Sequence, residues 1–336
     1  MASTPAARPA RSVQLDVIRA FAILLVIGAH LLVAAPDDGI IGSFAWAWHE
    51  YGGFGVPLFF TLSGYLVGGL LISEVQRHGS IDIRRFLIRR GLKIWPAYFV
   101  FLGYLVAMPI LRGRASLHDQ LADYWPNALF LHNYVGPNPA LHTWSLAVEE
   151  HFYLALPFLL LAIVRLGLMR WIAPLFLMAP VFTTLLRVAY AASGDPYMAV
   201  QTMVATHLWA DALLVGVGVR ALAEFSPDLF AGFHAWRWPL LAAGALLLAI
   251  VTLPMPKLAG VPINRIIPII TMSATALLIG TLHLKLAGRT AAVLAWIGMY
   301  SYGIYLWHVA VVGVVHRSIT LCCRKAAPRN GWLLRW

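Results

Sequence analysis

The sequence predicts an all-α protein, a polytopic membrane bundle of about nine to ten transmembrane helices. Of its 336 residues, 60% are hydrophobic and only 12% are charged, and the mean hydropathy is +0.76. Soluble globular domains carry about 25% charged residues, so the chain is too apolar for that class. Its long apolar runs are expected to be helices, because an open strand cannot satisfy its backbone in lipid.

Nine apolar runs are candidates for membrane spans. They fall at 15–35, 54–72, 94–111, 143–164, 171–192, 203–223, 238–256, 263–284 and 291–315. We expect three regions: a cytoplasmic tail at 1–14, a transmembrane domain at 15–316 and a basic, atypical tail at 317–336. The first run could also be a cleaved secretory signal, but its length and buried charges favour a retained span.

Positive charges predict the orientation of the spans. Basic residues gather before the first span, between 77 and 93, and after the fourth span, whereas Asp and Glu occupy the intervening loops. Since Lys and Arg favour cytoplasmic loops, the N-terminus is expected in the cytoplasm. This alternation of basic and acidic loops fails at 317–336, because nine spans would place this basic tail outside the cytoplasm. Either the spans are miscounted, or a final helix after residue 316 is missing and the tail is atypical.

The net charge of +11 lies in short basic runs between apolar segments, with no basic domain. Membrane lipids and anionic ligands are therefore the expected partners, and nucleic acid is not. Cys322 and Cys323 are the only cysteines, and adjacent cysteines offer no metal-ligand spacing, so no metal is expected. Arg187 and Asp211 both lie in spans, where we expect them to neutralise each other across helices.

The first span carries three ionisable residues, Asp16, Arg19 and His30. Each costs roughly 2.5 to 3.5 kcal/mol or more in a bilayer, so such residues usually face a protein interior and mark a functional path. Arg19 and His30 are eleven residues apart. They therefore lie on nearly the same helix face, about 16 Å apart along the axis. We expect that face to carry a cation near one surface and an imidazole near the membrane centre.

In the second span, Ser63 and Tyr65 lie among small residues, which favours either close helix packing or a ligand contact. The third span begins with a basic run: Arg84, Arg85, Arg89, Arg90 and Lys93. This run suits either a lipid surface or a phosphate-bearing cytosolic ligand. The second interpretation is preferred, because cations one helical turn apart can hold one anion from two sides.

The fourth span opens with LHTWSLAVEEHFY, which contains Trp144, Ser145 and Glu149. Carboxylates at a helix start can simply favour the helix dipole. Glu149, however, lies past the first turn and heads an apolar run, so we expect it to face the protein interior. In the ninth span, MYSYGIYLWH contains Ser301, Tyr302 and His308. The tyrosines favour packing, whereas a buried histidine favours chemistry.

Five motifs in this order resemble the membrane acyltransferase 3 family. They are R-x10-H (Arg19, His30), FFTLSGYL, RR-x-x-K-I-x-P, HTWSLAVEEHFY and SYGIYLWH. Members of that family are multi-span O-acyltransferases of the bacterial inner membrane, which use cytosolic acyl-CoA, usually acetyl-CoA, to modify sugars. The resemblance implies an acyl-CoA donor and a carbohydrate or glycoside acceptor. It also implies roles for His30 in acyl transfer, for Arg90 with Lys93 in CoA binding, and for Glu149.

Two features depart from the family pattern. Lys93 stands where the second arginine of R-x-x-R is usual, which keeps the charge but loses bidentate geometry. The sequence RSITLCCRKAAPRNGWLLRW stands where the family has a further helix.

We expect His30 to be the general base, or a transient acyl carrier, with Glu149 orienting it if the fold brings them together. Arg19 is expected either to guide the thioester or to hold Asp16, and Arg89, Arg90, Lys93 and Ser63 are expected to bind the donor. Substrate-binding or structural roles fall to Asp16, Tyr65, Trp144, Ser145, Ser301, Tyr302 and His308. Two alternatives remain. One is a proton-coupled transporter of a polar solute with a His30 and Glu149 relay, and the other is a structural membrane protein.

Overall fold

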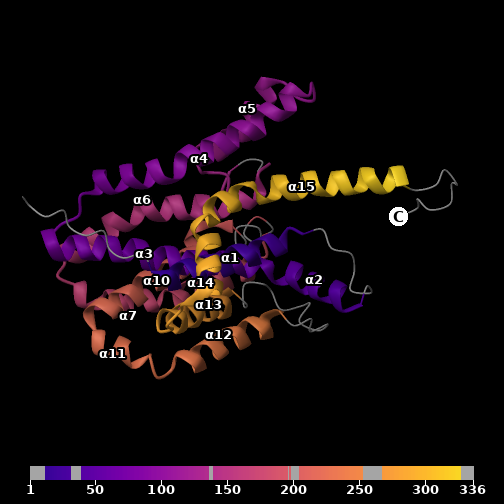
Figure 1. The fold of residues 1–336 in the computed structure, drawn as a ribbon. Helices are drawn as coiled ribbons and strands as arrows, with labels where there is room; N and C mark the ends of the chain where they lie inside the picture. Colours follow the sequence, from indigo (N-terminus) through magenta and orange to yellow (C-terminus); the bar gives the residue numbers. More distant parts are fainter. Residues whose placement is uncertain are drawn as a thin grey trace, which may run out of the picture.

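The computed structural model describes residues 12–31, 39–135, 139–195, 197, 204–252 and 267–326. Within these ranges the chain forms helices joined by turns and contains no strand (Figure 1). The predicted all-α class is therefore confirmed for the described part of the chain. Most of the two predicted tails lies outside it, since only 12–14 and 317–326 are described.

The helices follow the predicted order of apolar runs. In the first half they are α1 (Val13–Ala29), α2 (Gly39–Tyr51), η1 (Gly52–Phe54), α3 (Gly55–His78), α4 (Ile83–Leu111), α5 (Leu117–Ala128), η2 (Leu141–Thr143) and α6 (Trp144–Arg165). In the second half they are η3 (Met169–Trp171), α7 (Ile172–Leu177), α8 (Ala179–Ser193), α10 (Thr206–Phe225), α11 (Pro227–Gly232), α12 (Arg237–Thr252), α13 (Ile267–Leu282), α14 (Gly288–Met299) and α15 (Ser301–Ala326).

The predicted number of nine to ten spans is not reproduced. Within the described ranges, three stretches are long and apolar enough to cross a membrane: Gly39–His78, Ile83–Leu111 and Leu141–Arg165. Two bent pairs, α7 with α8 (43°) and α14 with α15 (71°), raise the number to five if each is one span. Of the other helices, α1, α12 and α13 have only 17, 16 and 16 residues, and α10 carries the charged residues Asp211, Arg220 and Glu224.

Two stretches predicted as loops, 36–53 and 112–141, contain the helices α2 and α5. The start of α5 is a capping box. The Ser116 hydroxyl accepts a hydrogen bond from the Asp119 amide (3.2 Å), and the Asp119 carboxylate accepts one from the Ser116 amide (3.4 Å). The Ser116 hydroxyl and amide lower the pKa of Asp119 by stabilising its carboxylate. This Ser-x-x-Asp pattern is visible in the sequence and could have predicted the helix.

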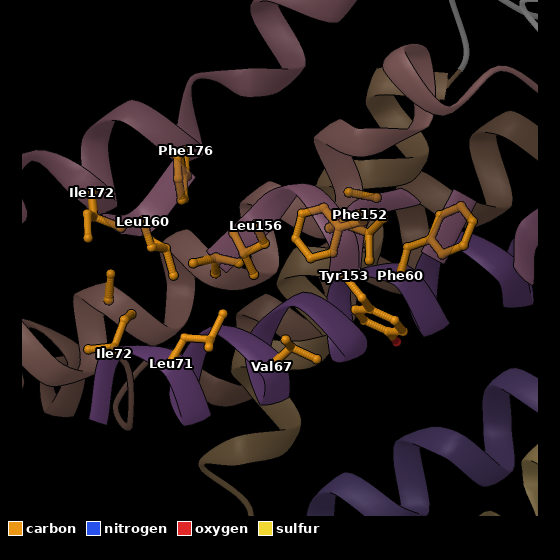
Figure 2. Close-up of a cluster of buried hydrophobic side chains, with 14 of the residues drawn as sticks. Phe60, Val67, Leu71, Ile72, Phe152, Tyr153, Leu156, Leu160, Ile172 and Phe176 are labelled. Atoms are coloured by element: carbon orange, nitrogen blue, oxygen red, sulfur yellow. The ribbon is translucent and has the colours of Figure 1, made fainter. Parts of the chain in front are cut away.

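The largest buried cluster joins α3, α6 and α7. Phe60 and Leu71 of α3 belong to it with Leu156 of α6 and with Ile172 and Phe176 of α7 (Figure 2). Between helices in lipid there is little hydrophobic driving force, because lipid tails are as apolar as leucine. The cluster therefore stabilises the fold through close packing of its side chains.

At the crossing of α3 and α10 there is no room for a side chain. A Cβ atom on Gly64 would overlap the carbonyl oxygen of Leu213, and one on Gly216 would overlap that of Thr61. Small residues permit backbones to approach in this way. Of the two interpretations of the small residues in the second span, close packing describes Gly64, and α3 continues through it without unwinding.

Replacing Gly64 by alanine is expected to destabilise the protein by about 1–3 kcal/mol, because the added methyl group meets backbone that cannot move aside. The control is Gly103→Ala in α4, where a Cβ atom has nothing within 4 Å. That change should be neutral or stabilising, since alanine is the better helix former. Unfolding in detergent micelles measures both, and equal stability of the two variants would contradict the close crossing.

Candidate active site

A central cavity of about 580 Å³ lies between α1, α3, α4, α6 and the junction of α14 with α15. Its volume is typical of small-molecule sites. Its polar and charged lining residues are Arg19, Ser63, Arg90, Lys93, Ser145, Glu149, Tyr153, Ser301, Tyr302 and Tyr305. Much of the remaining wall consists of apolar side chains of α3, including Phe59, Leu62 and Leu66. The cavity therefore combines three cations with one carboxylate and a largely apolar side.

The α4 wall supplies two of the cations. Arg90 and Lys93 are three residues apart, so helical periodicity places both on the face that lines the cavity. The Arg90 guanidinium lies over the ring of Tyr153, 5.2 Å from its centroid, and 5.8 Å from that of Phe86. Cation–π contacts of this kind hold the side chain in place. Arg89, one position away, is exposed and does not line the cavity.

A line of polar groups joins α3 to α6 at the cavity wall. The Tyr153 hydroxyl donates to Oε2 of Glu149 at 3.0 Å, one turn away on the same helix. The Tyr153 oxygen is also hydrogen-bonded to the Ser63 hydroxyl. Because Tyr153 has a single proton and gives it to Glu149, Ser63 must be the donor to Tyr153. Glu149 is thus fixed by hydroxyl groups at the cavity.

Arg19 reaches the cavity from α1 while paired with Asp16. The distance from Nη1 of Arg19 to Oδ1 of Asp16 is 2.7 Å, and Asp16 is buried. Of the two roles predicted for Arg19, the ion pair with Asp16 is therefore observed. A guanidinium has five N–H donors, so Arg19 keeps further donors that can face the cavity while it is paired with Asp16.

Beyond one wall of the cavity, three histidines form a cluster: His30, His142 and His308. The ring centroids of His30 and His308 are 4.7 Å apart, those of His142 and His308 5.4 Å, and those of His30 and His142 6.4 Å. His30 follows the last residue of α1, His142 lies in η2 and His308 in α15. The described residues contain no group of three or more His, Cys, Asp or Glu arranged to hold a metal ion.

The hydrogen bonds of the histidine cluster assign its protons. Nδ1 of His308 lies 2.6 Å from the carbonyl oxygen of Tyr305, which can only accept, so this nitrogen carries hydrogen. Nε2 of His308 is then an acceptor, 3.2 Å from Nδ1 of His30. Nδ1 of His30 also lies 2.9 Å from the Val26 carbonyl oxygen and must donate. Neutral His30 therefore carries its lone pair on Nε2.

Tyr305 is shared by the central cavity and the histidine cluster. It lines the cavity, and its ring centroid is 6.1 Å from that of His142 and 5.6 Å from that of His308. Its hydroxyl donates to the carbonyl oxygen of His142 and is 2.6 Å from the Ser145 hydroxyl, which then donates to it. These bonds fix the position of Tyr305, which lies where the central cavity meets the histidine cluster.

The structure brings together only some of the predicted site residues. His30 has His308 as its side-chain partner, whereas Glu149 bonds to Tyr153, so the prediction that Glu149 orients His30 is not met. Glu149 lines the central cavity together with Tyr305, and His30 is not among the residues that line it. The ninth span is also not continuous, since the chain bends by 71° between α14 and α15.

The other predicted residues fall into two groups. Ser145, Ser301 and Tyr302 line the cavity, and the Tyr302 hydroxyl donates to the Ile94 carbonyl oxygen at 2.8 Å. Tyr65 and Trp144 pack against other side chains and do not line the central cavity. The Tyr65 ring lies beneath the guanidinium of Arg220, and Trp144 packs with Phe60 and Trp209.

Three residues at the site were missed as candidates: His142, Tyr153 and Tyr305. All three lie inside motifs that the sequence displays. Tyr153 is four residues after Glu149, and Tyr305 is four after Ser301, so helical spacing could have placed each beside a candidate already chosen. His142 offers no such signal, because its neighbours come from α1 and α15.

Comparisons with known proteins find a matching family and several relatives. The family described as "acyltransferase domain" matches residues 12–321. The peptidoglycan O-acetyltransferase OatA of Listeria monocytogenes is 28% identical over 89% of this chain and 49% of its own length. A putative peptidoglycan O-acetyltransferase of Bacillus subtilis, YrhL, is 29% identical over 89% of this chain and 48% of its own.

A putative O-acetyltransferase of Staphylococcus aureus is 26% identical over 90% of this chain and 51% of its own length. The chain thus spans about half the length of these curated relatives. No solved structure matches the chain.

Proposed function

The chain belongs to the family of acyltransferase domains, and we propose that it moves an acetyl group from acetyl-CoA to a hydroxyl group of a carbohydrate. The observation that carries this proposal is that a cavity lined by Arg19, Arg90 and Lys93 shares the wall residue Tyr305 with a histidine cluster. The names of the relatives make peptidoglycan the first acceptor to test, before other glycosides.

The lining of the central cavity suits a CoA thioester. Its cations suit phosphate groups, because charge-assisted hydrogen bonds to phosphate are among the strongest in proteins. Phe59, Leu62 and Leu66 offer an apolar surface to the uncharged arm and acyl group. Glu149 is the one carboxylate of this lining, and the bond from Tyr153 partly satisfies it.

The histidine cluster supplies the proton chemistry. His30 takes the proton of the acceptor hydroxyl on Nε2, and the hydroxyl oxygen forms a bond with the thioester carbonyl carbon. The carbon–sulfur bond then breaks, and His30 returns the proton to the departing thiolate, which leaves as CoA thiol. His308 acts as a positioning residue, because its Nε2 accepts from Nδ1 of His30 and so keeps the lone pair on the opposite nitrogen.

His142 is the proposed donor to the developing negative charge on the carbonyl oxygen. Its Nε2 lies 3.4 Å from the carbonyl oxygen of Leu306, a distance beyond the usual range for a hydrogen bond. A stronger acceptor would therefore attract this N–H. Donors aimed at such charge are usually a large part of catalysis in acyl transfer.

We further propose that the protein lies in the bacterial inner membrane with its basic end in the cytoplasm. The end of the bundle at which α1 begins is where α3 and α6 end and α4 starts, and it carries Arg77, Arg84, Arg85, Arg165 and Arg170. Such an excess of arginine is typical of the cytoplasmic side. Arg90 and Lys93 lie two to three turns into α4 from this end, where cytosolic acetyl-CoA could reach them.

The proposal is tested with the purified chain in nanodiscs, supplied with acetyl-CoA and soluble peptidoglycan fragments. We expect release of CoA thiol together with a fragment heavier by one acetyl group. Movement of a polar solute across the membrane without use of acetyl-CoA would favour a transporter and overturn the proposal.

Replacing Arg90 by alanine is expected to raise the KM for acetyl-CoA about ten- to a hundredfold, with a smaller effect on kcat. The physical reason is the loss of a charged hydrogen-bond donor that holds the bound donor and does not take part in chemistry. The matched control is Arg84→Ala, an exposed arginine of the same helix outside the cavity lining. Initial rates over a range of acetyl-CoA concentrations measure the effect, and equal KM values for the two variants would contradict it.

A further inference from the structure

A second cavity, of about 360 Å³, lies at the end of the bundle where α1 begins. Its lining comes from the turn before α12, from the first residues of α12 and from the segment between α13 and α14. The lining residues are His234, Arg237, Trp238, His283, Leu284, Lys285 and Leu286. The amide of Gln14, in the first turn of α1, donates to the carbonyl oxygen of Leu284 at 3.0 Å, which fixes the position of this segment. We call this the basic cavity.

The charged side chains that line the basic cavity are all basic. Arg237, Lys285 and two imidazoles line it, with no carboxylate among the lining residues. The Arg237 guanidinium donates to the carbonyl oxygen of His234 (2.5 Å), and none of the ion pairs found in the described residues includes Arg237 or Lys285. The lining thus carries positive charge without a carboxylate to balance it, which favours an anionic ligand.

A buried ring nitrogen at the cavity offers a second contact for a ligand. Nε2 of His283 is buried and has no hydrogen-bond partner among the described residues. The ring packs against that of Phe230, 4.9 Å between centroids, and edge-on to that of His234 at 6.2 Å. Burial lowers the pKa of His283, and the nearby charges of His234 and Arg237 lower it further. The ring also donates to the backbone of Phe230, and because Nε2 has no partner this donor is Nδ1. Neutral His283 therefore presents the lone pair of Nε2, and a hydroxyl group of a ligand would satisfy this otherwise costly buried atom.

The side chains around the basic cavity indicate that its ligand also has an apolar part. Trp236 and Trp238 are 63% and 62% exposed beside the cavity, and tryptophans are typical of the membrane–water interface. Leu284 and Leu286 make part of the lining apolar. Basic pockets between membrane helices on the cytoplasmic side commonly hold anionic lipid headgroups.

We propose that the basic cavity binds the phosphate group of an anionic ligand, namely the headgroup of an anionic phospholipid or a free phosphate. Arg237 and Lys285 bind the phosphate oxygens, and Nε2 of His283 accepts a hydrogen bond from a hydroxyl group of the ligand. This site is separate from the central cavity, and the proposal does not depend on acyl transfer.

The test uses the whole chain in neutral detergent micelles. Its unfolding midpoint is followed while phosphatidylglycerol, phosphatidylcholine or inorganic phosphate is added, because a ligand that binds the folded state raises this midpoint. We expect phosphatidylglycerol to raise it and zwitterionic phosphatidylcholine not to. A comparable rise with inorganic phosphate would identify a free phosphate as the ligand, whereas a rise with the lipid alone would identify the headgroup.

Variants distinguish specific binding in the basic cavity from general attraction of anions to surface charge. Arg237→Gln and Lys285→Gln are each expected to weaken the apparent affinity for phosphatidylglycerol about tenfold, which corresponds to the loss of one charge-assisted bond. The control is Arg289→Gln, an exposed cation in the first turn of α14 that does not line the cavity. Lys285 is itself exposed, so its variant should still fold if Arg237→Gln does not. No response to any of the three additions, or an equal loss in Arg289→Gln and Lys285→Gln, would overturn the proposal.

Discussion

Replacing His30 by alanine is expected to lower the rate of acetyl transfer by about 10²- to 10⁴-fold, the range contributed by a positioned general base. The reason is the proton assignment of the histidine cluster. Hydrogen on Nδ1 of His30 is directed at the Val26 carbonyl oxygen and at His308, which leaves the lone pair on Nε2 for the acceptor hydroxyl. Release of CoA thiol at saturating acetyl-CoA measures the loss.

Two further variants make the His30 result specific. His118→Ala removes an imidazole that is 93% exposed in α5, and it should leave the rate unchanged. His308→Gln should lower kcat less than His30→Ala, since it removes the group that positions His30 and not the base itself. It should also alter the dependence of kcat on pH, which a purely structural role would not predict. A folded His30→Ala protein with full activity would eliminate the proposed mechanism.

Replacing Asp211 by alanine is expected to destabilise the protein by about 3–5 kcal/mol, because it would leave the guanidinium of Arg187 buried without a counter-ion. The prediction that these two residues neutralise each other is confirmed. Nη1 of Arg187 lies 3.3 Å from Oδ2 of Asp211, and neither side chain is exposed. The pair joins α8 to α10.

Hydrogen bonds complete this buried ion pair. The Thr183 hydroxyl donates to Oδ2 of Asp211 at 3.1 Å, and the Thr271 hydroxyl approaches the same oxygen from α13 at 3.5 Å. Nη2 of Arg187 donates to the Leu208 carbonyl oxygen. The guanidinium also lies 5.8 Å from the ring centroid of Trp209. One carboxylate therefore links three helices, and its removal affects all of these contacts.

Unfolding in detergent measures the effect of Asp211→Ala on stability. Two further variants show whether the loss comes from the buried charge. Glu224→Gln breaks the partly exposed pair of Glu224 with Arg220, at 2.9 Å, and should cost less than about 1 kcal/mol. The double variant Arg187→Met with Asp211→Leu should recover most of the stability, because apolar residues of similar size often replace a buried ion pair without loss. A cost for Asp211→Ala no larger than that for Glu224→Gln would contradict this account.

The candidate site was predictable where its residues share one helix. Arg90 and Lys93 line one cavity because they are three residues apart on α4, and Asp16 pairs with Arg19 at the same spacing on α1. Periodicity of this kind can be read directly from the sequence. Ser145 and Glu149 are four residues apart on α6, and both line the central cavity.

Across helices, prediction paired Arg187 with Asp211 correctly but failed at the candidate site. The expected link between Glu149 and His30 depended on how α6 packs against α1, and the structure gives His30 a partner from α15 instead. The choice of nine to ten spans failed for a different reason, since an apolar run does not fix the length of the helix that forms within it. The runs at 15–35, 238–256 and 263–284 contain α1, α12 and α13, which have 17, 16 and 16 residues.

The sequence by itself determined the helical class, the approximate positions of the helices, the acyltransferase family and the local pairs of charged residues. These depend on composition and on contacts within a few turns of one helix. Only the tertiary structure decided that His30, His142 and His308 meet and that Tyr305 contacts this cluster while lining the cation-lined cavity. It also decided that a basic cavity forms between the start of α12 and the α13–α14 segment. The physical reason is that helix packing depends on close fits such as that of Gly64 against Leu213, which join residues far apart in the chain and leave no periodic pattern in it.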